Sequence, residues 1–175
     1  MLGIDFYLSN ILFQWGRELP VGLVVFLATF LIWFLAAGVF YSGWRLPAKR
    51  NIFFIKVVAA ITLVLVVNIL IGLFYWRARP FVSYHFLPLI SLLWENKSFP
   101  SDHAGVSWAL AALTARFNKK NSWLFFLAAL LISLGRVLSG VHYASDIVVG
   151  AGIGLLAAWL INLSDFFFVS RCQQK

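Results

Sequence analysis

The chain has 175 residues, of which 62% are hydrophobic and only 11% are charged. Soluble domains carry about 25% charged residues, so this composition excludes an ordinary soluble domain. Lysine and arginine outnumber aspartate and glutamate by 14 to 6. These basic residues are not gathered into a soluble basic face, so we expect the partner to be a membrane and not a nucleic acid. The composition predicts one all-α integral membrane domain over residues 1–175, with the positive excess explained by topology.

The first segment, residues 1–19, mixes apolar side chains with polar and charged ones: Asp5, Asn10, Gln14, Arg17 and Glu18. This mixture predicts an amphipathic helix lying at the membrane interface; the alternative is a poor first span. Pro20 ends the segment, because proline cannot continue a helix.

Apolar runs with the character of membrane spans follow this segment. We expect spans at Val21–Tyr41, Ile52–Tyr75, His103–Phe117, Trp123–Leu134 and Ile147–Val169. Crossing a bilayer takes about 20 apolar residues, so the third run is short for a span. Gly150 and Gly154 have the spacing that permits close helix contact. The predicted fold is a bundle of five or six membrane helices, the N-terminal one at the interface.

Basic residues divide unequally between the two ends of this bundle. One end collects Arg45, Lys49, Arg50, Lys56, Arg116, Lys119, Lys120, Arg171 and Lys175. The other end has Arg17, Arg77, Arg79, Lys97 and Arg136. Cytoplasmic loops carry the larger share of lysine and arginine, so the first end should be cytoplasmic. The arginines of the outer end then need another explanation.

Polar stretches at the ends of spans fall on this outer side: Arg77–Phe81, Ser98–His103 and Gly135–Asp146. Ionisable residues at membrane depth are costly, which makes them candidates for function. In the second stretch Pro100 fits just before a helix, and Ser101 is a natural N-cap for a helix start that attracts anions. His103, in the first turn, is placed to donate a proton to a leaving group.

The third stretch adds a second histidine and a carboxylate. His142 and Asp146 are four apart, a spacing that predicts stacking on one helix face. The carboxylate would fix the tautomer of the ring and leave its other nitrogen free to attack. Arg136 supplies a planar fork suited to phosphate oxygens.

These residues predict phosphoryl transfer through a covalent phosphohistidine. His142 attacks phosphorus, while His103 protonates the departing oxygen and later activates water. The arginines and the helix start at Ser101 hold the phosphate oxygens. The structural alternative is that Arg79 and Arg136 are interfacial arginines that snorkel, and that the histidine–carboxylate pair only caps a span.

Carboxylates of the outer side are scattered along the sequence: Glu95, Asp102 and Asp146. A two-metal mechanism needs a cluster of such ligands, so we expect no metal ion and no cofactor.

The three stretches resemble the signature of the type 2 phosphatidic acid phosphatase superfamily of membrane lipid phosphatases. That signature has an Arg-Pro element, a Pro-Ser-x-His element and an Arg followed by His-x-x-x-Asp. The resemblance covers residues 77–146. It implies that the catalytic and phosphate-binding roles of the family fall on Arg79, Ser101, His103, Arg136, His142 and Asp146.

One position departs from the family pattern. The first element usually begins with a lysine seven residues before the arginine of Arg-Pro, and here that position is Gly72. Arg77 is a candidate substitute for binding the substrate, although an extended backbone would point it away from Arg79. We also predict that Lys97 contacts the substrate; the alternative is that it only meets lipid headgroups.

Within the superfamily, the short chain and the segments Arg-Pro-Phe and Ser-Phe-Pro-Ser-Asp-His are similar to the bacitracin-resistance type of undecaprenyl-pyrophosphate phosphatase. Those enzymes remove the terminal phosphate of the lipid carrier used for peptidoglycan synthesis. The resemblance implies a lipid pyrophosphate substrate and a multi-pass protein of the bacterial cytoplasmic membrane, with its site facing outward.

Three alternatives to this function stay open. The chain could be a phosphatidate or phosphatidylglycerophosphate phosphatase that uses the same pocket with a different lipid groove. It could be a lipid-binding protein with impaired catalysis, because the family lysine is missing. A transporter would place polar residues inside several spans, whereas here they gather at one end.

Overall fold

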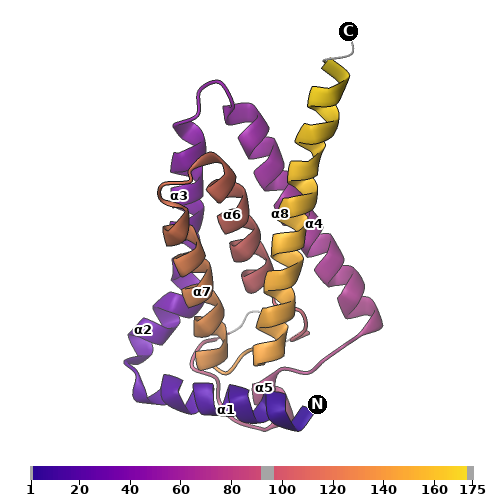
Figure 1. The fold of residues 1–175 in the computed structure, drawn as a ribbon. Coiled ribbons are helices and arrows are strands. Elements are labelled where there is room, and N and C mark those ends of the chain that lie inside the picture. The colour runs from indigo at the N-terminus through magenta and orange to yellow at the C-terminus, as the bar shows by residue number, and fades with distance from the viewer. Residues whose placement is uncertain (1, 92–96, 173–175) are drawn as a thin grey trace.

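The computed structural model describes residues 2–91 and 97–172, and the regular secondary structure in these ranges is helical (Figure 1). The segments are α1 (Leu2–Glu18), α2 (Val21–Val25), the π-helix η1 (Phe26–Phe30), α3 (Leu31–Trp44), α4 (Arg50–Phe74), α5 (Pro80–Ser83), α6 (Asp102–Phe117), α7 (Ser122–Leu138) and α8 (Ala144–Cys172). Glu95 and Lys175, which entered the sequence predictions, lie outside the described residues.

Helices long and apolar enough to cross a membrane form the outer part of the bundle. Among the described residues there are three such stretches, Val21–Trp44, Arg50–Phe74 and Ala144–Leu163. α7 is a shorter apolar helix, and α6 lies between the other helices (Figure 1). Helices therefore form at all five predicted positions, and three of these stretches are long and apolar enough to span, which agrees with the expected all-α membrane fold.

α1 lies crosswise over one end of the bundle (Figure 1). Ser9 and Phe13 on one side of the helix are buried, while Tyr7, Leu8 and Trp15 are exposed. Gly16 touches the end of α7 so closely that any side chain there would collide with the carbonyl oxygen of Leu138. This arrangement is that of a helix on the surface of the bundle, as the mixed composition of residues 1–19 predicts.

The two groups of loops predicted from charge lie at opposite ends of the bundle. The connection between α3 and α4 and the turn between α6 and α7 lie at one end, together with the last turns of α8 (Figure 1). α1, α5 and the start of α8 lie at the other end. The three polar stretches are therefore brought to one end, and the basic loops to the other.

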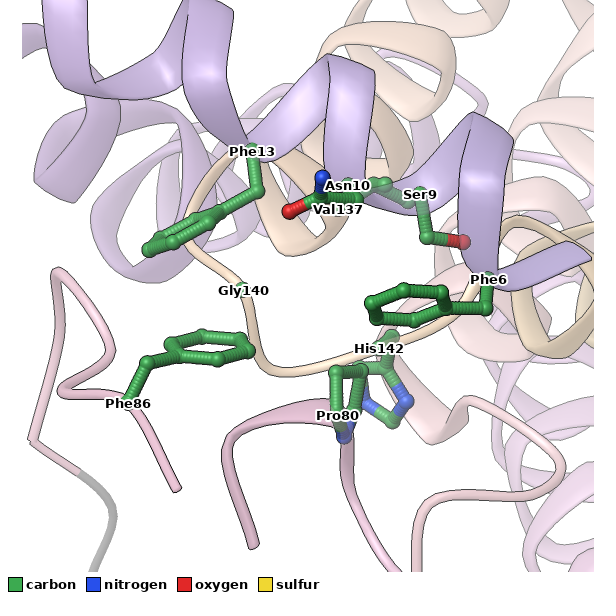
Figure 2. A pocket seen from close by; sticks show the side chains of 9 residues that line it. All are labelled: Phe6, Ser9, Asn10, Phe13, Pro80, Phe86, Val137, Gly140 and His142. Atoms are coloured by element: carbon green, nitrogen blue, oxygen red, sulfur yellow. The ribbon is translucent and has the colours of Figure 1, made fainter. Parts of the chain in front are cut away.

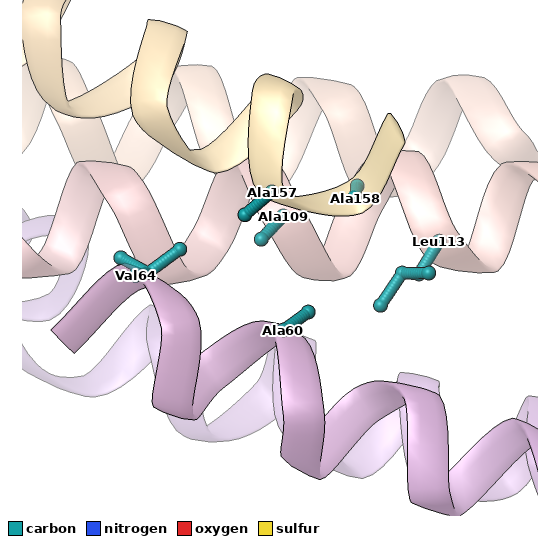
Figure 3. Close-up of a cluster of buried hydrophobic side chains, with 6 residues drawn as sticks. All are labelled: Ala60, Val64, Ala109, Leu113, Ala157 and Ala158. Atoms are coloured by element: carbon teal, nitrogen blue, oxygen red, sulfur yellow. The ribbon is translucent and has the colours of Figure 1, made fainter. Parts of the chain in front are cut away.

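Small side chains let α4, α6 and α8 approach closely, as the alanine-rich core in Figure 3 shows: Ala60, Val64, Ala109, Leu113, Ala157 and Ala158. A side chain at Gly154 would collide with the carbonyl oxygen of Gly105, and one at Gly150 would lie 2.6 Å from that of Ser101. The predicted close contact at these glycines is confirmed. It brings the starts of α6 and α8 together, and the Ser101 amide donates to the carbonyl oxygen of Asp146 at 3.2 Å.

Candidate active site

The N-terminus of α6 forms as the sequence predicts. The helix begins at Asp102, and the hydroxyl of Ser101 accepts a hydrogen bond from the Ala104 amide at 3.5 Å. Ser101 is fully buried, while His103 in the first turn stays partly exposed. The capped start therefore presents its remaining amides and the His103 ring at the same place.

The three polar stretches meet around this helix start. His103 lies within electrostatic range of Arg79, Arg136 and His142, and His142 interacts with both arginines in turn. Arg79 Nη1 lies 3.2 Å from His142 Nε2 and donates to the carbonyl oxygen of Val141 at 2.9 Å. Two histidines and two arginines from distant parts of the sequence thus share one site.

The boundaries of α7 and α8 correct one part of the sequence analysis. α7 continues to Leu138 and α8 begins at Ala144, so His142 lies in the loop between them. The prediction that His142 and Asp146 share a helix face was wrong. Gly140 adopts a φ of +78°, a left-handed conformation that stops α7 and turns the chain.

Asp146 nevertheless reaches His142 by folding back over the first turn of α8. Its Oδ2 lies 3.4 Å from His142 Nδ1 and also accepts from the Tyr143 amide at 2.8 Å and from Ser98 Oγ at 2.5 Å. Its Oδ1 accepts from Arg77 Nη1 at 2.9 Å. Asp146 is fully buried, so these contacts replace the water that would otherwise solvate its charge.

The contacts of the His142 ring define its tautomer. Arginine can only donate, so Nε2 accepts from Arg79 and must carry no proton. The proton is then on Nδ1, which faces Asp146. Burial lowers the pKa of His142 to about 4; Arg136 and Arg79 act in the same sense, and Asp146 opposes them. The ring is therefore neutral at pH 7, and the lone pair of Nε2 can attack phosphorus once Arg79 donates to the phosphate instead.

Arg136 is positioned by an irregular part of the first long span. Its Nη1 donates to the carbonyl oxygen of Ala28, in the π-helical segment η1, at 3.1 Å. The neighbouring Gly135 packs directly against this segment, where a side chain would come within 2.7 Å of the Ala28 amide. π-Helical turns are frequent at functional sites, and this one supplies the carbonyl group that orients Arg136.

The two guanidinium groups keep donors that nothing in the described part of the chain accepts. The Nε atoms of Arg79 and Arg136 are buried and have no hydrogen-bond partner among the described residues. The two side chains repel each other electrostatically, and burial lowers the pKa of Arg79. Desolvated cations whose donors are only partly used cost free energy, which an anion bound between them would recover.

Lys97 lies against the position that lacks the family lysine. Its Nζ donates to the carbonyl oxygen of Asn68, and its side chain passes over Gly72, where a Cβ would collide with it. Lys97 is within electrostatic range of Asp102 and Arg79. The missing side chain at residue 72 therefore makes room for a lysine that comes from another part of the sequence.

Arg77 has different partners from Arg79. Its guanidinium donates to side-chain oxygens of Asp5, Ser145 and Asp146. The sequence analysis did not single out Asp5 or Ser98. The chain has only 6 acidic residues, and Asp5 is one of them, placed among apolar residues near the N-terminus. This unusual position was the signal in the sequence that could have indicated a specific partner for Asp5.

α1 covers one side of the His142 ring (Figure 2). The cavity between them is about 10 Å³ and is lined by side chains of α1 together with Pro80, Phe86 and His142. Such a volume holds roughly one water molecule. The partly exposed site residues are Arg79, Lys97 and His103, so the site is open on the side of the α6 N-terminus.

A helical membrane bundle that surrounds a neutral histidine with buried guanidinium groups, at one end of its spans, is the architecture of a membrane lipid phosphatase. The PAP2 superfamily profile matches residues 53–169, and the chain belongs to this superfamily. The predicted resemblance is thereby confirmed.

Named relatives agree with this assignment. The chain is 31% identical over 141 residues to the bacitracin transport permease protein BcrC of Bacillus licheniformis, covering 79% of this chain and 68% of that protein. It is 32% identical over 96 residues to the undecaprenyl-diphosphatase BcrC of Bacillus subtilis, covering 55% and 49%. The crystal structure of Aquifex aeolicus LpxE superposes with a TM-score of 0.71 at 25% identity, over 89% of this chain and 92% of that chain.

Proposed function

We propose that the protein hydrolyses undecaprenyl pyrophosphate to the monophosphate through a phosphohistidine intermediate, with its site on the outer side of the bacterial cytoplasmic membrane. The observation that carries this proposal is the pair of buried guanidinium groups with unused donors beside a neutral imidazole. The substrate is supported by the similarity to an undecaprenyl-diphosphatase. The unequal division of basic loops supports the outward orientation.

In the first step His142 Nε2 attacks the terminal phosphorus. A nitrogen–phosphorus bond forms as the bond from phosphorus to the bridging oxygen breaks. His103, which takes up a proton when the anionic pyrophosphate binds beside it, gives that proton to the bridging oxygen, and undecaprenyl phosphate leaves. Asp146 stabilises the positive charge that develops on the attacked ring, because its carboxylate faces the Nδ1 proton.

In the second step His103 accepts a proton from water, and the resulting hydroxide attacks the phosphorus. The nitrogen–phosphorus bond breaks and its electron pair returns to Nε2. Inorganic phosphate leaves, and both histidines are back in their starting protonation states.

The cations hold the phosphate during both steps. We assign the oxygens of the transferred group to Arg79, Arg136 and the amides that follow Ser101. Lys97 is assigned to the second phosphate of the substrate, because it lies on the open side of the site within electrostatic range of Arg79. Preorganised donors of this kind stabilise the transition state more than the bound substrate.

The test is phosphate release by the purified protein in detergent, with undecaprenyl pyrophosphate, phosphatidate and phosphatidylglycerophosphate compared at equal mole fraction. The proposal predicts that the pyrophosphate has the highest kcat/KM. Faster turnover of a glycerophospholipid would establish the alternative phosphatase function. Binding of all three lipids without phosphate release would establish a lipid-binding protein.

Trapping the intermediate tests the chemistry separately from the substrate. Alkaline quenching of a reaction with substrate labelled in the terminal phosphate should leave an acid-labile phosphoprotein. The label should be absent from His142→Ala, and its presence on that variant would overturn the assignment of the nucleophile.

A further inference from the structure

We propose that Arg77 and Asp5 are positioning residues: Arg77 orients the Asp146 carboxylate, and Asp5 anchors α1 to Arg77 and to the start of α8. The first helix thereby sets the orientation of the His142 ring. This inference rests on the proposed function only in its assumption that His142 is the nucleophile.

The guanidinium group of Arg77 already donates to three side chains. Nη1 donates to Ser145 Oγ at 2.7 Å and to Asp146 Oδ1 at 2.9 Å, and Nη2 donates to Asp5 Oδ2 at 2.6 Å. The group also lies 3.6 Å from the centroid of the Tyr143 ring. A phosphate would have to compete with two carboxylates for this arginine, whereas Arg79 and Arg136 have no carboxylate partner among the described residues and keep buried donors without an acceptor.

The contact with Arg77 fixes how the Asp146 carboxylate is turned. One oxygen, Oδ1, accepts from Arg77, so the other, Oδ2, is left to face His142 Nδ1. Arg77 also places a positive charge beside this fully buried carboxylate, at 2.9 Å from Oδ1. Loss of Arg77 would leave Oδ1 of Asp146 without its charged partner. Among the described residues, only Ser98 and the Tyr143 amide would then hold the carboxylate, which would weaken its hold on the imidazole.

α1 completes the chain of contacts by capping α8 from outside. The first amides of a helix have no partner within the helix. Here the Ala144 amide donates to Ser9 Oγ at 2.9 Å and the Ser145 amide donates to Asp5 Oδ1 at 3.0 Å. Both acceptors come from a helix more than 130 positions earlier.

The charge state of Asp5 agrees with this role. Burial alone would raise the pKa of Asp5, but hydrogen bonds from Ser145 and Arg77 outweigh that effect and lower it. The carboxylate is therefore held ionised by the contacts that attach α1 to the catalytic loop. Figure 2 shows two other side chains of α1, Phe6 and Ser9, which line the same small cavity as the His142 ring.

The experiment compares Arg77→Gln with Arg79→Gln, two arginines that are two positions apart. A positioning role predicts that Arg77→Gln lowers kcat by about 10- to 100-fold, as for other residues that orient a reacting side chain. The KM and the inhibition constant for inorganic phosphate should stay within about twofold. Arg79→Gln should instead raise the inhibition constant for phosphate at least about tenfold, a loss of roughly 1.4 kcal/mol.

Further variants separate positioning from a loss of folding. Arg77→Lys keeps the positive charge but cannot contact Asp5 and Asp146 through two separate nitrogens, so its kcat should lie between those of Arg77→Gln and the wild type. Asp5→Asn should lower kcat, and the double variant Asp5→Asn/Arg77→Gln should lose less than the product of the two single losses, because both single changes remove the same contact between Arg77 and Asp5. Glu18→Gln, an exposed acid on the same helix, is the matched control and should change nothing.

An unchanged kcat for Arg77→Gln, combined with weaker phosphate inhibition equal to that of Arg79→Gln, would overturn the inference and make Arg77 a phosphate ligand. The measurement uses whichever lipid the wild-type protein turns over. A wrong substrate assignment would therefore appear in the wild type, and a wrong role for Arg77 only in the variants.

Discussion

Arg45 and Arg50, at one end of the bundle, and Arg136, at the other end, have different surroundings. At the end with the basic loops, Arg45 is exposed and donates to the Tyr41 hydroxyl at 3.1 Å. Arg50 lies over the Trp44 ring, 5.0 Å from its centroid. Such residues stay hydrated and rest on interfacial aromatic rings, so they add to topology without needing a ligand.

At the site end the same residue type is taken out of water. Arg136 is only 4% exposed, and its one hydrogen bond to the described chain uses a backbone carbonyl oxygen and leaves Nε unused. The comparison shows that residue type does not separate a topology signal from a binding site. A buried guanidinium group with an unused donor indicates a binding site, because the buried cation gains more free energy from a bound anion than a hydrated one does.

The largest effect should come from removing the nucleophile at the site end. His142→Ala should reduce phosphate release by at least about 10³-fold, because the covalent step is lost. The matched control is His85→Asn, since His85 is exposed with a φ of 54° that asparagine tolerates. Assays of both variants under saturating substrate test this, and turnover by His142→Ala within tenfold of wild type would contradict it.

Arginines from the two ends give the most direct test of the comparison. Arg136→Gln should lower kcat/KM by about 10²- to 10³-fold, the usual cost of removing a donor that stabilises transition-state charge. Arg45→Gln should stay within about twofold, because its side chain is hydrated. Equal losses in the two variants would mean that burial does not distinguish the two ends.

An intermediate effect on KM is expected from changing Lys97, which lies at the site end, and from placing a lysine at Gly72. Lys97→Ala should raise KM about tenfold, since a charge-assisted hydrogen bond to a partly exposed phosphate is worth roughly 1.5 kcal/mol. Introducing Gly72→Lys into Lys97→Ala should restore KM, because the side chain that passes over Gly72 is then gone. Lys119→Ala, at the other end, is the control. If the KM of the double variant stays as high as that of Lys97→Ala, a lysine at residue 72 does not replace Lys97, and the assigned role of Lys97 is wrong.

The activity should not fall on the acid side. Burial lowers the pKa of His142 to about 4, so the ring stays neutral as the pH falls through 6.5, where an ordinary histidine becomes protonated. Between pH 7 and 5.5, kcat/KM should not fall after correction for ionisation of the substrate, because a lower pH leaves His142 neutral and favours the protonated form of His103 that the mechanism requires. A roughly tenfold fall over this range would indicate an unperturbed histidine.

The smallest expected effect is that of a chelator. Guanidinium and imidazole groups supply the positive charge in the proposed mechanism, so phosphate release should be unchanged in excess EDTA. Loss of activity that added Mg²⁺ restores would overturn the metal-independent mechanism.

Much of the fold follows from constraints that act locally on the sequence. A bilayer demands long apolar helices, so the spans were predictable within a few residues at most ends. The order of the polar stretches also placed Arg79, His103, Arg136 and His142 at one end of the bundle. Electrostatic contacts among these four side chains agree with that prediction.

Contacts between distant segments could not be read in the same way. The spacing of His142 and Asp146 predicted a helix face, but Gly140 ends α7 before that face can form. The partnership of Asp5 with Arg77 spans 72 positions and depends on how α1 crosses the bundle. The path of Lys97 over Gly72 likewise depends on tertiary packing, which no local pattern encodes.

The π-helical turn at Phe26–Phe30 carries a consequence for comparing homologous chains. Each residue of an α-helix advances the chain by about 100° around the axis, and a π turn accommodates one residue beyond the regular repeat. Deleting Thr29 would allow a regular helix, rotate α2 relative to α3 by about that angle, and move the Ala28 carbonyl away from Arg136. Alignments of this span should therefore admit a single-residue gap between Phe26 and Phe30, where a shift of register would otherwise pass unnoticed.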